Sequence, residues 1–281
     1  MQAHPDSLFI QDPDTGRQVY VEKIGEEEPA RGWVLLLHGL GDHMGRHGWL
    51  KERLLDRGFG VLGIDWPGCG LSEGVRGDLP SMEQARGIIE LAIETTEVTL
   101  AGVFAHSAGG FFLLRLLAKP TKGFESLKWA WFSSPLVCPD TNHGVLKIAM
   151  AHILSRVLPH FTLSTHVRRD DCYHTAPDEE ARKLPEGCHD RISLRFGSHL
   201  ISVAGDEKEL ATTVPVHLRI LLTQGLDDHI CPPEFGERLY HALPHRERTF
   251  LAAAGARHEP FREPNRFTLL SAIELWLDQQ I

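Results

Sequence analysis

Three residue types that could act together in acyl transfer occur at widely separated points of the chain. Ser107 lies in the stretch VFAHSAGG, directly after an apolar run and before small residues. Two adjacent aspartates, Asp227 and Asp228, follow another apolar run, and His258 follows a third in GARHEP. A serine hydroxyl is a poor nucleophile until a base removes its proton, and an acid that orients a histidine makes that histidine an effective base. The pattern predicts Ser107 as nucleophile, His258 as base and one of the two aspartates as acid.

Each of these residues also has an ordinary interpretation. Small residues around a serine fit any tight strand-to-helix turn, and aspartates in loops usually form solvated turns. The chain contains 17 histidines, so a single loop histidine is a weak signal by itself. Position favours the chemical interpretation, because ligands of a parallel sheet bind beyond the carboxyl ends of its strands, where all of these residues lie.

The elements that must position these residues alternate along the chain. Short apolar runs bounded by glycine, proline or polar clusters are separated by segments of helical periodicity, which predicts a mostly parallel sheet with crossover helices. The first two runs alternate apolar and polar residues, which predicts an antiparallel pair at a sheet edge. The predicted strands cover residues 7–10, 18–24, 33–38, 59–65, 98–105, 128–134, 218–224 and 246–253. The predicted helices cover residues 47–57, 81–97, 108–118, 234–242 and 264–279.

One interval breaks this alternation. Roughly eighty residues pass between Leu136 and Pro215 without a convincing central strand, which is too long a gap for a continuous α/β domain. We therefore expect a core of residues 1–136 and 216–281 and an inserted helical cap, or lid, of residues 137–215. A broadly apolar helix is predicted over residues 143–158. Its apolar stripe is wider than one packed face needs, although packing on its neighbours is the ordinary interpretation.

Composition excludes several classes of function. The chain has 281 residues, with 38 acidic against 29 basic side chains and a formal charge of −9, which opposes binding to nucleic acid. Five scattered cysteines predict reduced thiols and a cytoplasmic location, with neither a disulfide framework nor a zinc site. We expect no signal peptide, no spanning helix and no metal, and the predicted chemistry needs no cofactor.

The order serine, aspartate, histidine along the chain is that of the α/β-hydrolase triad. From about Trp33 onward the sequence resembles the monoglyceride lipase and lysophospholipase branch of that superfamily, which is of the serine aminopeptidase type. The resemblance is carried by HGLGDHMGRH, DWPGCGLSEG, AHSAGG, SSPLV and LLTQGLDD, and in the cap by VLPHFTL and RISLRFG. It implies an α/β-hydrolase fold, with a mostly parallel eight-stranded sheet flanked by helices and an inserted helical cap.

The family's spacing of Gly-x-x-Asp, counted from Gly225, implies that Asp228 and not Asp227 is the acid. The tetrahedral intermediate of acyl transfer needs backbone donors, and we expect the N–H groups of Leu40 and Ala108 to form this oxyanion hole. Ala105 departs by one methyl group from the glycine of the family pattern Gly-x-Ser-x-Gly.

The expected function is hydrolysis of carboxylic esters of lipid-like substrates through an acyl-enzyme, with a monoacylglycerol or a lysophospholipid as substrate. The resemblance also implies an alternative to simple packing for the helix of residues 143–158, which would line an acyl tunnel or touch a lipid surface. Transient contact of the cap with a membrane surface is part of this expectation. Two alternatives stay open: another acyl hydrolase on the same fold (a peptidase, thioesterase or cofactor-free perhydrolase), and a non-catalytic hydrolase-like binding protein.

Overall fold

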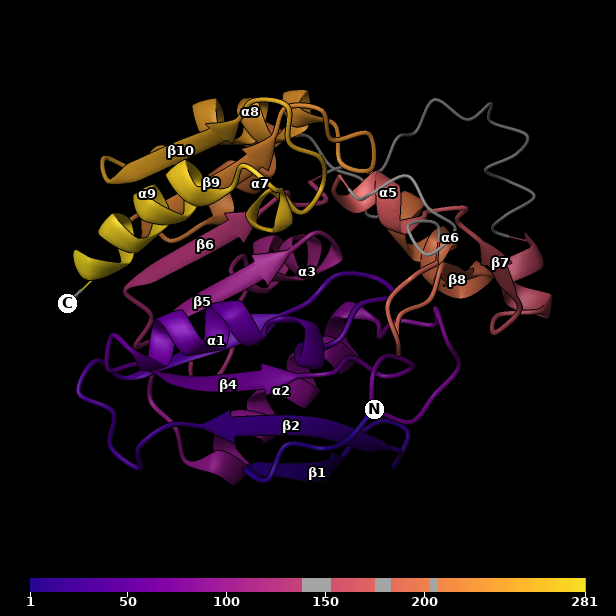
Figure 1. Cartoon of the computed structure of the whole chain (residues 1–281). Helices are drawn as coiled ribbons and strands as arrows, with labels where there is room; N and C mark the ends of the chain where they lie inside the picture. The colour runs from indigo at the N-terminus through magenta and orange to yellow at the C-terminus, as the bar shows by residue number, and fades with distance from the viewer. Residues whose placement is uncertain (138–152, 175–182, 203–206, 281) are drawn as a thin grey trace.

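The computed structural model describes residues 1–137, 153–174, 183–202 and 207–280, and its central feature is an eight-stranded sheet (Figure 1). The strand order is β1-β2-β4-β3-β5-β6-β9-β10. The pair β1–β2 is antiparallel and the neighbours from β4 to β10 are parallel, as predicted from the sequence. The pair β2–β4 is also antiparallel, which the sequence did not predict. These strands are β1 (Ser7–Gln11), β2 (Gln18–Ile24), β3 (Trp33–Leu37), β4 (Gly60–Ile64), β5 (Leu100–His106), β6 (Trp129–Ser133), β9 (Arg219–Gly225) and β10 (Arg248–Ala253).

The register of the parallel strands brings distant loops to one edge of the sheet. Leu37 of β3 pairs with Ala105 of β5, Ala105 pairs with Phe132 of β6, and Phe132 pairs with Leu222 of β9. The carboxyl ends of these strands therefore lie side by side. The loops that follow β3, β5 and β9 meet at this edge.

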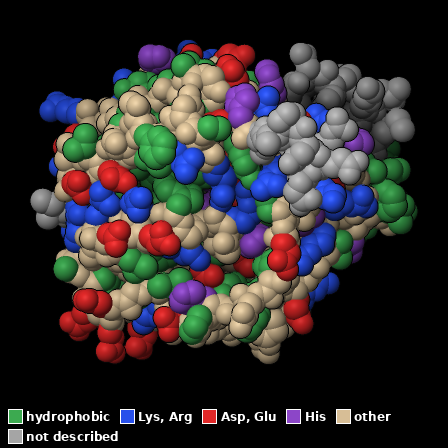
Figure 2. Space-filling model, viewed as in Figure 1, with side chains coloured by type: hydrophobic (Ala, Val, Ile, Leu, Met, Phe, Trp, Pro, Cys, Tyr) green, Lys and Arg blue, Asp and Glu red, His purple; other side chains and the backbone are tan. Residues whose placement is uncertain are grey.

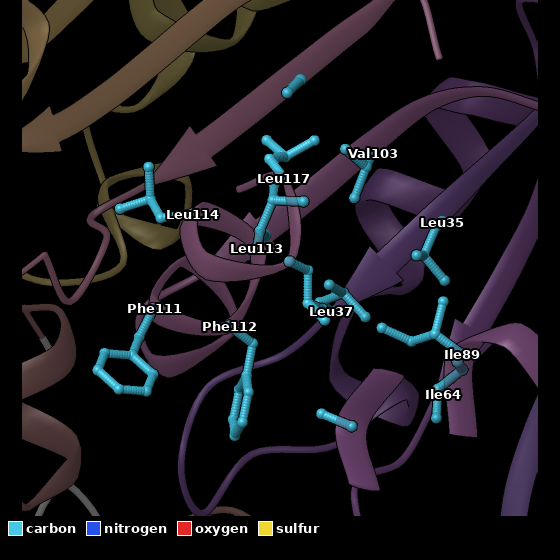
Figure 3. Close-up of a cluster of buried hydrophobic side chains, with 14 of the residues drawn as sticks. Leu35, Leu37, Ile64, Ile89, Val103, Phe111, Phe112, Leu113, Leu114 and Leu117 are labelled. Atoms are coloured by element: carbon cyan, nitrogen blue, oxygen red, sulfur yellow. The ribbon is translucent and has the colours of Figure 1, made fainter. Parts of the chain in front are cut away.

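Helices cover both faces of the sheet. Strand residues that point to one face, such as Leu36 and Phe104, pack with α1 (Gly48–Leu55) and α9 (Phe267–Asp278). Residues that point to the other face pack with α2 (Met82–Thr96), α3 (Ala108–Leu116) and α8 (Pro233–Ala242). Figure 3 shows part of this second cluster, where Phe112 and Leu113 of α3 lie near Leu37 of β3. Continuously apolar strands form here because both of their faces are buried.

The chain between β6 and β9 leaves the main sheet. Its described part contains α5 (Arg169–Cys172), α6 (Leu194–Ser202), α7 (Glu207–Thr213) and a small antiparallel sheet of β7 (Thr162–Ser164) and β8 (Arg191–Ser193). The sequence did not predict these two strands, because three residues are too few for an alternating pattern. Most of the helix predicted over residues 143–158 lies outside the described residues.

Several contacts attach this segment to the rest of the fold. The carboxylate of Asp78, in the loop before α2, accepts hydrogen bonds from Ser193 Oγ (2.6 Å) and Arg195 Nε (2.9 Å). The His189 N–H donates to the carbonyl of Gly41 (3.0 Å), in the loop after β3. By contrast, α7 packs against α3 and α8, although it falls within the range expected for the cap.

Candidate active site

Ser107 occupies a sharp turn between β5 and α3. Its backbone has φ 53° and ψ −118°, a conformation that costs a non-glycine residue of the order of 1–3 kcal/mol. The surrounding backbone holds the turn in place: the Ser107 N–H donates to the Ser133 carbonyl (3.0 Å), and the Ser107 carbonyl accepts from the N–H groups of Gly110 (2.9 Å) and Leu136 (2.9 Å). These bonds fix the position of Ser107, which lines a cavity.

Close packing around this turn explains its small residues. A Cβ atom on Gly109 would overlap with the carbonyl of Leu37, and one on Gly39 would lie 2.9 Å from Ser107 Cβ. Ala105 is buried within β5, so the turn accommodates the methyl group that departs from the family pattern.

His258 and Asp228 meet across the ends of β9 and β10. His258 Nδ1 lies 2.8 Å from Asp228 Oδ2, and both side chains are buried. Asp228 also accepts hydrogen bonds from the Gln224 amide (3.0 Å) and from the N–H groups of Ile230 and Cys231 (2.9 Å each). Since an ionised carboxylate only accepts hydrogen bonds, His258 Nδ1 must donate, which leaves Nε2 as the proton acceptor of the neutral ring.

The electrostatics of the pair follow from this contact. Burial by itself would lower the pKa of His258, but the charge and hydrogen bond of Asp228, aided by Glu259 and Asp42, raise that pKa above its ordinary value. The neighbouring Asp227 is exposed, and its N–H bonds to the Ala256 carbonyl (2.8 Å). Of the two adjacent aspartates, Asp228 is the one in contact with His258.

Ser107 and His258 line one cavity of about 380 Å³ at this edge of the sheet. Within the described part of the chain no hydrogen bond joins their side chains. The Ser107 side chain instead interacts with the thiol of Cys231, whose pKa is raised well above its ordinary value by burial and by Asp228. Cys231 therefore stays a thiol and is a poor nucleophile in this position.

Leu40 and Ala108 line the same cavity from two sides. Leu40 lies in the turn after β3, and Ala108 is the first residue of α3. Neither backbone N–H donates a hydrogen bond to another residue in the portion of the chain that the structure covers. Both N–H groups are thus left without a protein acceptor in that part of the chain, and the first N–H groups of a helix favour a nearby negative charge.

The cavity is lined by both apolar and polar side chains. The apolar ones include Leu136, Val167, Leu184, Ile192, Phe196, Leu200 and Ile230. The polar ones include Asp42, Arg46, Arg169, Tyr173 and Glu259. Most of the apolar side chains come from the segment between β6 and β9, so that segment shapes the space above Ser107.

Residues beneath the site have structural roles. His38 is fully buried, with Nδ1 2.7 Å from the Gly39 carbonyl and Nε2 accepting from the Trp66 N–H (3.0 Å). Burial lowers the pKa of His38 to about 3, so its ring is neutral. The Asp65 carboxylate accepts from the N–H groups of Met44 (2.7 Å) and Leu71 (2.9 Å), which fixes the loops after β3 and β4.

No sequence pattern indicated Arg46 and Glu259, which lie 213 positions apart and bond to each other at this cavity. No group of His, Cys, Asp or Glu that could hold a metal ion is found among the described residues. Within the same part of the chain, no helix has the length and apolar character needed to cross a membrane.

A mostly parallel eight-stranded sheet flanked by helices, with a serine on a sharp turn after a central strand, defines an α/β-hydrolase. A model of the family described as serine aminopeptidase, S33 (Hydrolase_4) matches residues 28–265, so the chain belongs to this family. The resemblance noted in the sequence is thereby confirmed.

Solved structures and curated proteins point to the same branch of the family. The crystal structure of the Paleococcus ferrophilus monoacylglycerol lipase is 32% identical, with a TM-score of 0.80 over 94% of this chain and 99% of that one. The monoacylglycerol lipase of Mycolicibacterium smegmatis is 24% identical and covers 93% of this chain and 92% of its own length. An uncharacterized abhydrolase domain-containing protein of Dictyostelium discoideum is 27% identical over 88% of this chain, which spans only 26% of that protein's length.

Proposed function

We propose that this protein is a serine hydrolase that cleaves carboxylic esters of single-chain lipids, of the monoacylglycerol or lysophospholipid type, through an acyl-enzyme on Ser107. The observation that carries the proposal is the buried contact of 2.8 Å between His258 Nδ1 and Asp228 Oδ2, on the cavity that Ser107 also lines. This contact supports a single tautomer and a raised pKa for the His258 ring, which lines the same cavity as the strained Ser107.

In the proposed reaction, His258 Nε2 takes the proton of Ser107 Oγ as this oxygen attacks the ester carbonyl. The resulting oxyanion accepts hydrogen bonds from the N–H groups of Leu40 and Ala108. Asp228 stabilises the imidazolium, which then gives its proton to the leaving alcohol. A water molecule, deprotonated by His258, releases the fatty acid from Ser107.

Because no hydrogen bond joins Ser107 to His258 within the described residues, this mechanism requires a small approach of the two side chains. Catalytic hydrogen bonds often tighten only when substrate binds. The displacement of the Ser107 side chain from Cys231 toward His258 is the movement we propose.

The mixed lining of the cavity supports a lipid ester as substrate. Its apolar side chains would bury an acyl chain, and its polar side chains would contact the alcohol part of the ester. Relatives that bear the name monoacylglycerol lipase agree with this assignment.

We further propose that residues 137–215 form a cap that touches a membrane surface. In its described part six large apolar side chains are 45–71% exposed. They are Ile153, Leu154, Val157, Leu158, Phe161 and Leu163. Figure 2 shows hydrophobic atoms gathered at the right-hand edge of the molecule, in the region of β7. Such a patch would bind to the interface of a bilayer, and a cytoplasmic location of the protein stays a prediction.

Sedimentation with phosphatidylcholine vesicles tests the membrane contact. The double variant Val157→Ser with Phe161→Ser should lose binding. The matched control, Val216→Ser with Phe267→Ser, removes exposed side chains of the same types (68% and 69%, against 71% for Val157 and 54% for Phe161) outside the patch and should bind like the unmodified protein. Equal binding of both variants would contradict a role for the cap.

Turnover of p-nitrophenyl esters of increasing acyl length, together with monoacylglycerols and lysophospholipids, tests the substrate class. We expect a preference for medium to long chains and loss of activity in Ser107→Ala. The control Ser134→Ala removes a buried hydroxyl that makes no hydrogen bond within the described residues, and it should retain activity. Activity confined to acetate esters would contradict the lipid assignment.

The family description favours one second candidate, a peptidase. Hydrolysis of aminoacyl β-naphthylamides, measured beside the lipid esters, separates the two. A higher kcat/KM for the amides would replace the lipase proposal by the peptidase, with the same roles for Ser107, Asp228 and His258.

A further inference from the structure

Arg46 lies between two carboxylates that come from opposite ends of the chain. Its Nη1 bonds to Asp42 Oδ1 (2.8 Å), and its Nη2 bonds to both carboxylate oxygens of Glu259 (3.0 and 2.9 Å). The three side chains are nearly buried, with exposed fractions of 11% for Arg46, 7% for Asp42 and 5% for Glu259. The planar guanidinium is suited to such a bridge, because its donors are fixed relative to one another.

Each carboxylate of the bridge has a further partner within the described structure. The second oxygen of Asp42 contacts His47 Nε2 (2.8 Å), and Glu259 Oε2 also lies 2.6 Å from Arg262 Nε. Burial by itself would lower the pKa of Arg46, but the two carboxylates raise it, so the guanidinium stays charged. Removing one partner would leave an unpaired buried charge, whereas the intact set holds its members in one arrangement.

The two carboxylates belong to the two loops that the proposed reaction needs. Asp42 is two residues from Leu40, whose N–H is a proposed oxyanion donor. Glu259 directly follows His258, and its own N–H donates to the Cys172 carbonyl of α5 (2.7 Å). A change in the distance between these loops would alter the position of the base relative to the oxyanion.

We propose that Arg46 is a positioning residue, which holds the loop of Leu40 and the loop of His258 in a fixed mutual geometry. The inference rests on the proposed function. It adds a residue that does not touch the reacting atoms, yet sets where the base and the oxyanion donor stand.

A double-mutant cycle of Arg46→Gln and Glu259→Gln tests this role. We expect each single variant to lower kcat by about 10- to 100-fold with little change in KM, because a misplacement of about 1 Å has an effect of this size. The double variant should lose no more than the worse single variant, since both changes break one bridge. Additive losses, or a raised KM with normal kcat, would overturn the proposal in favour of direct substrate contact by Arg46.

Two further measurements separate positioning from folding. Arg46→Lys keeps the charge but loses the fork of donors, so it should fold with an unchanged melting temperature and still show a lowered kcat. The control Arg53→Gln breaks the more exposed ion pair of Arg53 with Glu274 (2.7 Å) between α1 and α9, and it should keep full kcat. Full activity of Arg46→Lys and Arg46→Gln would refute the positioning role.

The outcome is distinguishable from failure of the proposed function. If Ser107→Ala remains active, the serine mechanism itself is wrong, whatever the Arg46 variants do. If Ser107→Ala is inactive and both Arg46 variants are fully active, the serine mechanism stands and the bridge is only structural.

Glu259→Gln adds a measurement of pH dependence, because it removes a charge that raises the pKa of His258. The His258 ring also faces Asp228, Asp42 and the ring of His106. The acid limb of kcat/KM should therefore move to lower pH.

Discussion

The carboxylate of Asp228 and the imidazole of His258 form a buried hydrogen bond of 2.8 Å between residues 30 positions apart in the chain. The contact exists because β9 and β10 are parallel neighbours, with Gly225 paired to Ala253, so the loops that follow them emerge together. Its consequence is chemical: the bond fixes one tautomer of the neutral His258 ring and leaves the other ring nitrogen unprotonated, as the proposed role of base requires.

Replacing the acid should separate the two adjacent aspartates. Asp228→Asn is isosteric but does not stabilise the imidazolium, and in a triad such a change lowers kcat by about 10⁴-fold. Asp227→Asn changes an exposed side chain and should leave kcat within about 2-fold, in line with the small effect of surface substitutions. Steady-state kinetics on one ester would decide, and the reverse ranking would assign the acid to Asp227.

The pH profile should report the raised pKa of His258. Below this pKa the ring is protonated and cannot accept the Ser107 proton, so kcat/KM should fall as the pH drops through a value above the ordinary 6.5. In the residual activity of Asp228→Asn the acid limb should lie at lower pH, because the carboxylate charge that does most to raise the pKa of His258 is gone. An unshifted limb would mean that another group controls the profile.

Gly41→Ala tests the contact between the proposed cap and the loop after β3, which carries Leu40. A methyl group at Gly41 (φ 72°) would overlap with the His189 carbonyl, so the loop that carries Leu40 must shift. Loss of one oxyanion donor typically lowers kcat by about 100-fold or more, and we expect an effect of that size.

Gly16→Ala is the matched control for this variant, because Gly16 has nearly the same φ (70°) and open space around it. It should show only a loss of stability of about 1 kcal/mol. Equal kcat values for Gly41→Ala and Gly16→Ala would contradict the idea that the contact between His189 and Gly41 positions the loop of Leu40.

The backbone strain at Ser107 should lower the free energy of unfolding. Since glycine adopts φ 53° without a steric penalty, Ser107→Gly should be more stable to urea than Ser107→Ala, by about 1 kcal/mol. At Ser133, an ordinary strand residue of β6, the glycine variant should instead be the less stable one. If glycine is also the less stable choice at position 107, the turn is not strained.

Much of the fold could be predicted because local patterns encode it. Residues 18–24 alternate and form β2 over the same residues, and the apolar run 218–224 forms β9 shifted by one residue. The helix expected over 81–97 is observed as Met82–Thr96, and Ser81 caps it with Gln84 in a capping box. In each case periodicity and end signals agree, so tertiary contacts did not need to be known.

The contacts of the site were less accessible from the sequence. Ser107 and His258 could be named because each follows a predicted strand, and Asp228 because the family's Gly-x-x-Asp spacing separates it from Asp227. The bridge of Arg46 to Glu259, by contrast, depends on side-chain directions of loops far apart in the chain. Nothing in the stretch HMGRH distinguishes Arg46 from a solvated arginine. The strands β7 and β8 were missed because each has three residues.

Covalent labelling with a fluorophosphonate probe, followed by mass spectrometry of the labelled peptide, tests the central proposal most directly. The probe should add to Ser107 of the folded protein and abolish ester hydrolysis, and Ser107→Ala should remain unlabelled. Labelling of Ser107→Ala to the same extent, or a labelled peptide that does not contain residue 107, would show that the nucleophile is another residue.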